Sequence, residues 1–61
     1  MPRQRNSAKI MIVDDHPLVR EGLAMRLSTE HDMEVCGQAA SESEAAALIK
    51  QTRPDLMIVD I

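Results

Sequence analysis

Apolar and polar residues come in alternating blocks along the chain, and each block has the length and periodicity of one secondary-structure element. Short continuous apolar runs ended by acids, such as KIMIVDD, are typical of strands buried on both faces. Longer stretches in which apolar residues recur about every three or four positions are typical of amphipathic helices. These patterns predict strands over residues 9–15, 33–40 and 56–61 and helices over residues 16–28 and 41–52.

The first predicted helix, HPLVREGLAMRLS, begins with Pro17, whose fixed φ and missing N–H suit the first helical position. One apolar face is expected, formed by Leu18 or Val19, by Gly22 or Leu23, and by Leu27. Gly22 costs about 1 kcal/mol relative to Ala inside a helix. A close approach of this helix to the sheet would explain a glycine there.

The second half of the chain repeats the alternation of strand and helix. In the strand over 33–40, one face is expected to carry Met33, Val35, Gly37 and Ala39. In the next helix, Ser41 and Glu44 have the spacing of a capping box, in which each side chain bonds the other residue's backbone N–H. The expected apolar stripe of this helix consists of Ala45, Leu48 and Ile49.

The element order β-α-β-α-β is typical of an α/β fold with a parallel sheet and crossover helices. Such crossovers are right-handed in about 98% of cases, which leaves the strand orders 1-2-3 and 2-1-3. The first strand is apolar on both faces and needs cover on both, so the order 2-1-3 is favoured. In that order a crevice opens at the carboxyl ends of strands 1 and 3, where open α/β sheets bind ligands.

Composition narrows the class of protein. The chain has 61 residues, no aromatic residue and a net charge of −3, which argues mildly against nucleic-acid binding. Residues 1–7 are expected to form a disordered basic leader, and residues 8–61 a single domain at most. Cys36 is the only cysteine, which suits a reducing cytoplasm. No apolar run approaches the roughly 20 residues of a membrane span.

Three acids would meet at the predicted crevice, namely Asp14 and Asp15 after the first strand and Asp60 at the end of the last one. Converging carboxylates repel each other unless they share a proton or bind a cation. Mg²⁺ prefers such oxygen ligands, and it would leave a carboxylate free to attack a phosphoryl group. The plainer alternative is that strands often end in Asp and that Asp15 caps the helix.

His16 follows these acids and has two interpretations. It could be a metal ligand or a phosphoryl carrier, but a single histidine at a strand-to-helix turn is more often simply the residue that begins the helix. The structural interpretation of His16 is therefore favoured.

The stretches IMIVDDHPLVREGL and PDLMIVDI together resemble the first half of a bacterial response-regulator receiver domain. DDHPLVREGL is similar to receivers joined to a LuxR/FixJ/NarL-type helix-turn-helix output domain. The resemblance implies a truncated flavodoxin-like (CheY-like) fold, with Asp14, Asp15 and Asp60 holding Mg²⁺. It also implies that Asp60 is the phosphoacceptor and the catalytic carboxylate, in a protein that is no classical enzyme. A sensor histidine kinase or a small phosphodonor would supply the phosphoryl group, and DNA would be bound only through an output domain.

Receivers of that family have five strands and roughly twice this length. Their later strands carry a Ser or Thr and a Lys that contact the phosphoryl group. We therefore expect this chain by itself to bind Mg²⁺ weakly and to show little or no stable phosphorylation.

Three other classes were compared with the receiver interpretation. A mononucleotide-binding half-domain would need a Gly-rich turn after the first strand, and haloacid-dehalogenase-like phosphohydrolases carry Asp-x-Asp there, so both fit poorly. The third is a truncated, non-signalling module that only self-associates. An apolar edge strand pairs readily with another chain, and two copies would form a six-stranded sheet completed by dimerisation through the last strand. The residues expected at this homo-oligomer contact are Leu56, Met57, Ile58, Val59 and Ile61.

Overall fold

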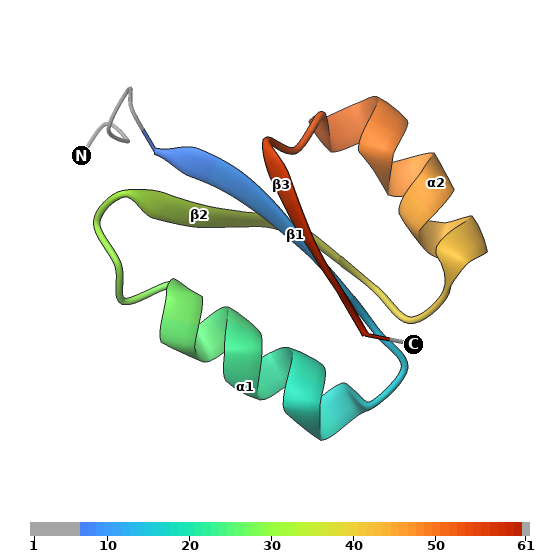
Figure 1. The fold of residues 1–61 in the computed structure, drawn as a ribbon, viewed down its shortest axis with the longest axis horizontal. Coiled ribbons are helices and arrows are strands. Elements are labelled where there is room, and N and C mark those ends of the chain that lie inside the picture. Colours follow the sequence, from blue (N-terminus) through green and yellow to red (C-terminus); the bar gives the residue numbers. More distant parts are fainter. Residues whose placement is uncertain (1–6, 61) are drawn as a thin grey trace.

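The computed structural model describes residues 7–60 and contains the five predicted elements in the predicted order (Figure 1). Both helices and all three strands agree with the sequence-based boundaries to within about two residues. The elements are β1 (Ala8–Asp14), α1 (Pro17–Leu27), β2 (Met33–Ala39), α2 (Glu42–Thr52) and β3 (Leu56–Asp60).

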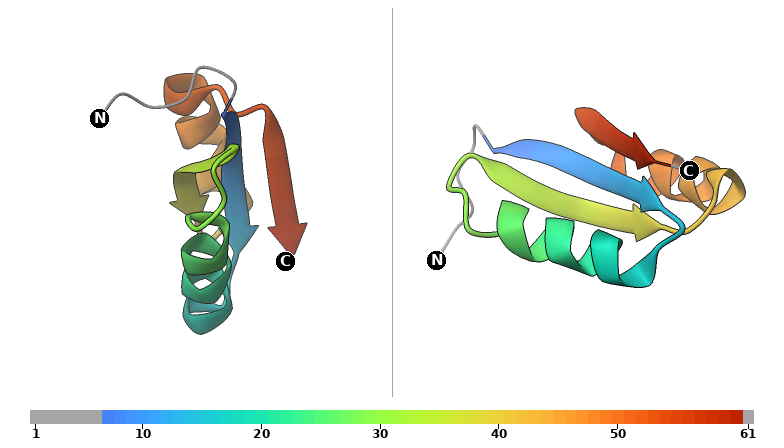
Figure 2. Two further views of the ribbon diagram at one scale, coloured as in Figure 1. Left: turned by 90° about the vertical axis from the view of Figure 1, so that its left-hand side faces the viewer. Right: turned by 60° about the horizontal axis from the view of Figure 1, so that its bottom comes forward.

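The three strands form a parallel sheet in the order β2-β1-β3, which confirms the favoured arrangement. The middle of β1 is almost completely buried, since Ile10, Met11, Ile12 and Val13 are each 0–2% exposed. The two helices lie on opposite sides of the sheet (Figures 1 and 2). The central strand is therefore covered on both faces, as its continuous apolar run predicted.

The beginning of β3 is fixed to the beginning of β1 by two short hydrogen bonds. The backbone N–H of Lys9 donates to Asp55 Oδ2 at 2.7 Å. The backbone N–H of Asp55 in turn donates to the Lys9 carbonyl, also at 2.7 Å. From this point the two strands run in regular register, from Ile10 opposite Leu56 to Asp14 opposite Asp60.

The hydrophobic core lies between the sheet and α2. Its buried members are Met11, Val13, Ala39 and Ala45, and Cys36, Leu48 and Met57 pack against them. The expected apolar stripe of α2 is thus confirmed for Ala45 and Leu48, whereas Ile49 is 37% exposed. The predicted capping box is also present, since Glu44 N–H donates to Ser41 Oγ at 3.2 Å and Ala40 N–H donates to Glu44 Oε1 at 2.9 Å.

Helix α1 packs more loosely than its sequence suggested, and none of its residues is fully buried. Leu18 is 84% exposed and Val19 48%, so the predicted apolar face is wrong at its N-terminal end. Only Leu23, Ala24 and Leu27, with Arg20, are half-buried toward the sheet. The reason is that a sheet of three strands offers α1 little surface beyond β1 and β2.

The close approach expected at Gly22 is also wrong. A Cβ added at Gly22 would meet nothing within 4 Å apart from its chain neighbours and the backbone of its own helix, so neither the sheet nor a neighbouring loop requires glycine there.

A β-bulge interrupts β2 and changes which side chains share a face. Ile10 pairs with Val35 but Met11 pairs with Gly37, so Cys36 is an extra residue in the ladder. The predicted single face of β2 is therefore broken in the middle, because an inserted residue reverses the alternation beyond it. Met33, at the start of that face, is 36% exposed, and Ala39, at its end, is buried.

The predicted basic leader covers residues 1–7. Residues 1–6 lie outside the described residues, and Ser7, its last member, is half-buried, so the leader remains a prediction. Within residues 7–60, neither helix has the length and apolar character that crossing a membrane requires.

Candidate functional site

The acids predicted to meet lie at the carboxyl-terminal edge of the sheet. Asp14 ends β1 and Asp60 ends β3, and the two residues are direct partners in the parallel register. Asp15 follows Asp14 in the turn that leads to α1. The turn is short because His16 and Pro17 begin the helix directly, with Pro17 at its first position. The predicted crevice residues are thus brought to one edge.

Asp14 is buried, with 1% of its surface exposed, and its two oxygens have different surroundings. Oδ1 accepts one hydrogen bond from the backbone N–H of His16 and lies 2.8 Å from His16 Nδ1. Oδ2 is buried and has no hydrogen-bond partner among the described residues. The hydrogen bonds from the His16 backbone and ring lower the pKa of Asp14, although burial acts in the opposite direction.

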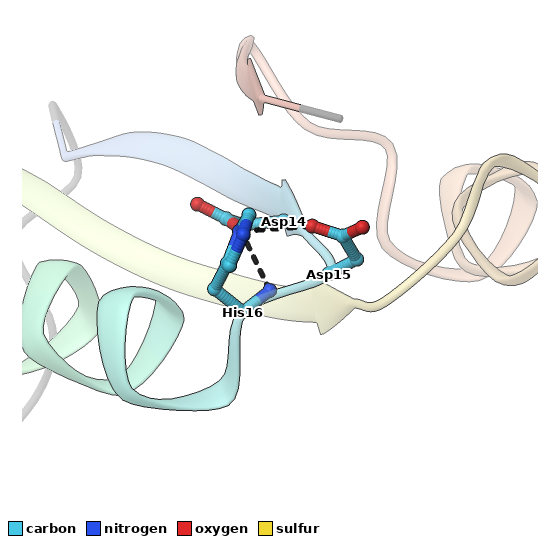
Figure 3. A group of neighbouring side chains, drawn as sticks. All are labelled: Asp14, Asp15 and His16. Carbon is cyan, nitrogen blue, oxygen red and sulfur yellow. Dashed lines mark hydrogen bonds and ion pairs between the residues drawn. The ribbon is translucent and has the colours of Figure 1, made fainter.

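His16 is turned back over the acids that precede it, as Figure 3 shows. Its Nδ1 lies 2.8 Å from Asp14 Oδ1 and 2.9 Å from Asp15 Oδ1. The side chains of Asp15 and His16 are 53% and 65% exposed. The hydrogen bond to Asp14, followed by the charges of Asp15 and Asp14, raises the pKa of His16, and the charge of Asp60 acts in the same direction.

Sequence reasoning placed His16 correctly at the helix start but missed its contacts. His16 occupies the N-cap position and makes no side-chain capping bond to the helix. Its backbone N–H is instead bonded by Asp14 two residues earlier, a local pattern that Asp commonly forms. The available signal in the sequence was the spacing: Asp14 stands two residues before His16, which itself precedes Pro17.

Arg20 is a second residue that sequence reasoning missed. Its Nη1 donates to the backbone carbonyl of Asp14 at 2.7 Å, and its charge also lowers the pKa of Asp14. Arg20 lies one helical turn beyond the start of α1, so this bond joins the helix to the end of β1. This hydrogen bond from Arg20 holds the Asp14 backbone, from which the Asp14 side chain projects.

The residues present fit a hard divalent cation. Carboxylate oxygens are the ligands that Mg²⁺ prefers, and it is usually bound through one or two carboxylates with several waters retained. The buried, unpartnered Asp14 Oδ2 is a strong acceptor without a donor, which is costly unless a cation or water satisfies it. Asp14 and Asp15 therefore offer suitable carboxylate donors, whereas Asp60, opposite Asp14 in the register, is not a member of this close group of ligand atoms.

Comparison with known proteins now identifies the family. The model of the response regulator receiver domain matches residues 10–61. The chain belongs to the response-regulator receiver family. The receiver is 47% identical over 53 residues to an uncharacterized transcriptional regulatory protein, YhcZ, of Bacillus subtilis. It is 45% identical over 53 residues to the response regulator protein VraR of Staphylococcus aureus.

Both comparisons cover 87% of the receiver chain and 25% of the relative. The chain thus spans about a quarter of the length of these curated relatives. No solved structure matches it. The receiver interpretation from sequence is confirmed, together with the truncated CheY-like order of elements. A receiver domain is a phosphoacceptor in phosphorelay signalling rather than a classical enzyme.

Proposed function

We propose that Asp60 is the residue that accepts the phosphoryl group in this receiver. The observation that carries the proposal is the register of the sheet, which sets Asp60 directly opposite Asp14 at the carboxyl-terminal edge. Asp60 is exposed, so a phosphodonor can approach it, whereas Asp14 is buried beside it. These two environments suit two different tasks for two neighbouring carboxylates.

Asp14, Asp15 and Asp60 would hold Mg²⁺ in this proposal, and the bound ion would neutralise charge on the transferring phosphoryl oxygens. A carboxylate oxygen of Asp60 attacks phosphorus and forms an acyl phosphate. When the donor is a phosphohistidine, the phosphorus–nitrogen bond breaks and the freed imidazole keeps that electron pair. Arg20 holds the end of β1 in place through the Asp14 carbonyl.

The partners follow from the family and remain part of the proposal. A sensor histidine kinase or a small phosphodonor supplies the phosphoryl group. In a longer protein the acyl phosphate would control a helix-turn-helix output domain that binds DNA and regulates transcription, in the cytoplasm. The names of the relatives, a transcriptional regulatory protein and a response regulator, support this output.

The test is labelling by acetyl phosphate in a version of the protein that extends beyond residue 61 to a complete receiver. Intact-mass analysis should detect one added phosphoryl group in the presence of Mg²⁺ and none in EDTA. Asp60→Asn should abolish the addition. Asp32→Asn, the same change in an exposed turn remote from the site, should leave it intact. Persistent labelling of the Asp60→Asn protein would show that another residue is the acceptor.

A second candidate, self-association of the 61-residue chain, is favoured by the free edge of β3. On this edge strand Leu56 is 56% exposed and Val59 58%. An apolar groove of about 190 Å³ runs beside it, lined by Val13, Glu42, Ala45, Ala46, Ile49, Met57 and Val59. Such an edge carries unpaired backbone groups and apolar side chains that another strand can cover.

The proposed occupant is β3 of a second copy, paired antiparallel about a two-fold axis through Ile58. Met57 of each copy then faces Val59 of the other, and the two apolar grooves become continuous. Ile61, which we also expected at this contact, lies outside the described residues. The family match favours a signalling receiver over a module that only self-associates. Light scattering from the folded chain tests the pairing, and a single monomeric species would contradict it.

A further inference from the structure

The cluster at the end of β1 contains a nitrogen donor as well as carboxylates. Asp14, Asp15 and His16 each offer one ligand atom, and these atoms lie within 4.8 Å of one another. Two of them come from exposed side chains and one from a buried side chain. Figure 3 shows the imidazole ring of His16 lying between the two carboxylates. An imidazole in this place is not required by a magnesium site, whose ligands are oxygens.

The two separations that involve His16 Nδ1 match those of neighbouring ligands around one metal ion. His16 Nδ1 is 2.8 Å from Asp14 Oδ1 and 2.9 Å from Asp15 Oδ1. Metal–ligand bonds of about 2.0–2.1 Å place adjacent corners of an octahedron roughly 2.9 Å apart. A cation could therefore replace the hydrogen-bonded proton without large movement of the three side chains.

A second observation also indicates a cation. Only 1% of the Asp14 surface is exposed, yet its Oδ2 has no hydrogen-bond donor among residues 7–60. This oxygen belongs to the same carboxylate whose Oδ1 contacts His16. A buried carboxylate oxygen without a donor is costly, and a cation that reached both oxygens of Asp14 would remove that cost. The carboxylate is also held in place, because the His16 backbone N–H bonds its other oxygen at 2.8 Å.

We propose that His16 Nδ1 is a metal ligand beside Asp14 and Asp15, so that this receiver binds divalent transition-metal ions of the imidazole-preferring class more tightly than Mg²⁺. The inference rests on the metal pocket of the proposed function and adds His16 to it. Imidazole suits Ni²⁺, Zn²⁺ and Cu²⁺, whereas carboxylate and water suit Mg²⁺. Ions of the first class would compete with Mg²⁺ for the same two carboxylates.

The test compares Ni²⁺ and Mg²⁺ as probes, by calorimetry on the tag-free 61-residue chain and three variants. Folding of each protein is checked by amide NMR. His16→Asn removes the proposed ligand from an exposed position, and His31→Asn is the matched control, since His31 is an exposed histidine in the turn before β2. Asp14→Asn tests the shared carboxylate. Broadening of the histidine ring signals by paramagnetic Ni²⁺ locates the ion independently of affinity.

The wild-type chain should bind Ni²⁺ more tightly than Mg²⁺, and Ni²⁺ should broaden the ring signals of His16 before those of His31. His16→Asn should weaken Ni²⁺ binding at least about tenfold, because loss of even an outer-shell partner typically costs about 10–100-fold. Asp14→Asn should weaken the binding of both ions, because its carboxylate is shared by both.

Two results would overturn the proposal in distinguishable ways. Equal Ni²⁺ affinity of wild type and His16→Asn, with Mg²⁺ still bound by both, would mean that the imidazole is only a hydrogen-bond partner and that the magnesium pocket stands. Failure of the folded wild-type chain to bind either ion would contradict the pocket itself, and with it the metal part of the proposed function.

Discussion

The two oxygens of Asp14 account for much of the electrostatics of the site. One oxygen accepts hydrogen bonds from His16, and the other is buried without a partner. The hydrogen bonds to the first oxygen lower the pKa of Asp14 by more than burial raises it, so the net shift is downward. The carboxylate therefore stays charged at neutral pH while buried, which is the state that a cation-binding acid requires.

The raised pKa of His16 predicts a pH dependence in the metal-free chain. The folded state favours the imidazolium, so its stabilising contribution is fully present below the unfolded value of 6.5 and is lost as pH rises through the folded-state pKa. In EDTA, the ring signals of His16 should titrate with a midpoint above 6.5. Asp14→Asn should lower that midpoint, because the first cause of the shift is the hydrogen bond to Asp14.

Asp14 contributes with the opposite sign. Its pKa is lowered from 3.8, so its contribution is present above that value and is lost as pH falls through the folded-state pKa.

A His16 midpoint at or below 6.5 in the folded, metal-free chain would contradict the ring contacts described for this site.

At the scale of elements, α1 is stabilised less by packing than α2. Its one glycine, Gly22, further lowers the stability of the helix because glycine is a poor helix former. Gly22→Ala should raise the free energy of unfolding by about 1 kcal/mol, because Ala is the better helix former and the new Cβ meets nothing within 4 Å. Urea denaturation measures the change. Ala47→Gly, at an exposed position of α2, should lower the free energy of unfolding by a similar amount. This variant shows how large the difference between glycine and alanine is in a helix of this chain. A destabilised Gly22→Ala chain would mean that α1 lies closer to the sheet.

Helix α2 is fixed at its beginning by the reciprocal bonds of Ser41 and Glu44. Ser41→Ala should lower the free energy of unfolding by about 0.5–2 kcal/mol, because the Glu44 N–H loses its acceptor. Ser43→Ala is the control in the same turn, since its hydroxyl contacts only the Ser41 hydroxyl, at 3.2 Å. The two variants are compared by thermal unfolding, and equal losses would show that the capping bond contributes nothing.

Features that depend on local pattern could be predicted from the sequence. β1 was placed at the centre because it is apolar on both faces, and the capping box was visible in two residues. The bulge at Cys36 could not be predicted, because small residues at 36 and 37 tolerate either register. The exposure of Leu18 depends on how far the sheet extends beneath α1, and the direction of the His16 ring depends on its rotamer.

At the scale of the whole molecule, the core is small and one edge of the sheet is open. The buried apolar residues are only Ile10, Met11, Ile12, Val13, Ala39 and Ala45 among those described. A domain of about 60 residues buries only about 60% of the surface that its unfolded chain exposes. Additional cover on β3 would therefore contribute substantially to stability.

Val59→Lys tests whether β3 is the surface through which copies associate. A lysine on an edge strand opposes strand pairing, since its charge must be desolvated in the new sheet. We expect the variant to remain monomeric at concentrations where the wild-type chain is dimeric, as measured by sedimentation velocity. Ala47→Lys, on the exposed side of α2, should dimerise like wild type. Unchanged dimerisation of Val59→Lys would place the contact elsewhere.

The paired bonds between Asp55 and Lys9 lie at the opposite end of β3 from Asp60. A strand displaced by one residue presents its other face, so a slip at that end would bring Val59 beside Asp14 and turn Asp60 away from it. The hydrogen bonds of Asp55 thus help to fix the register of β3 against β1. An aspartate just before β3, remote from Asp60, therefore helps to fix the position of the proposed phosphoacceptor beside Asp14.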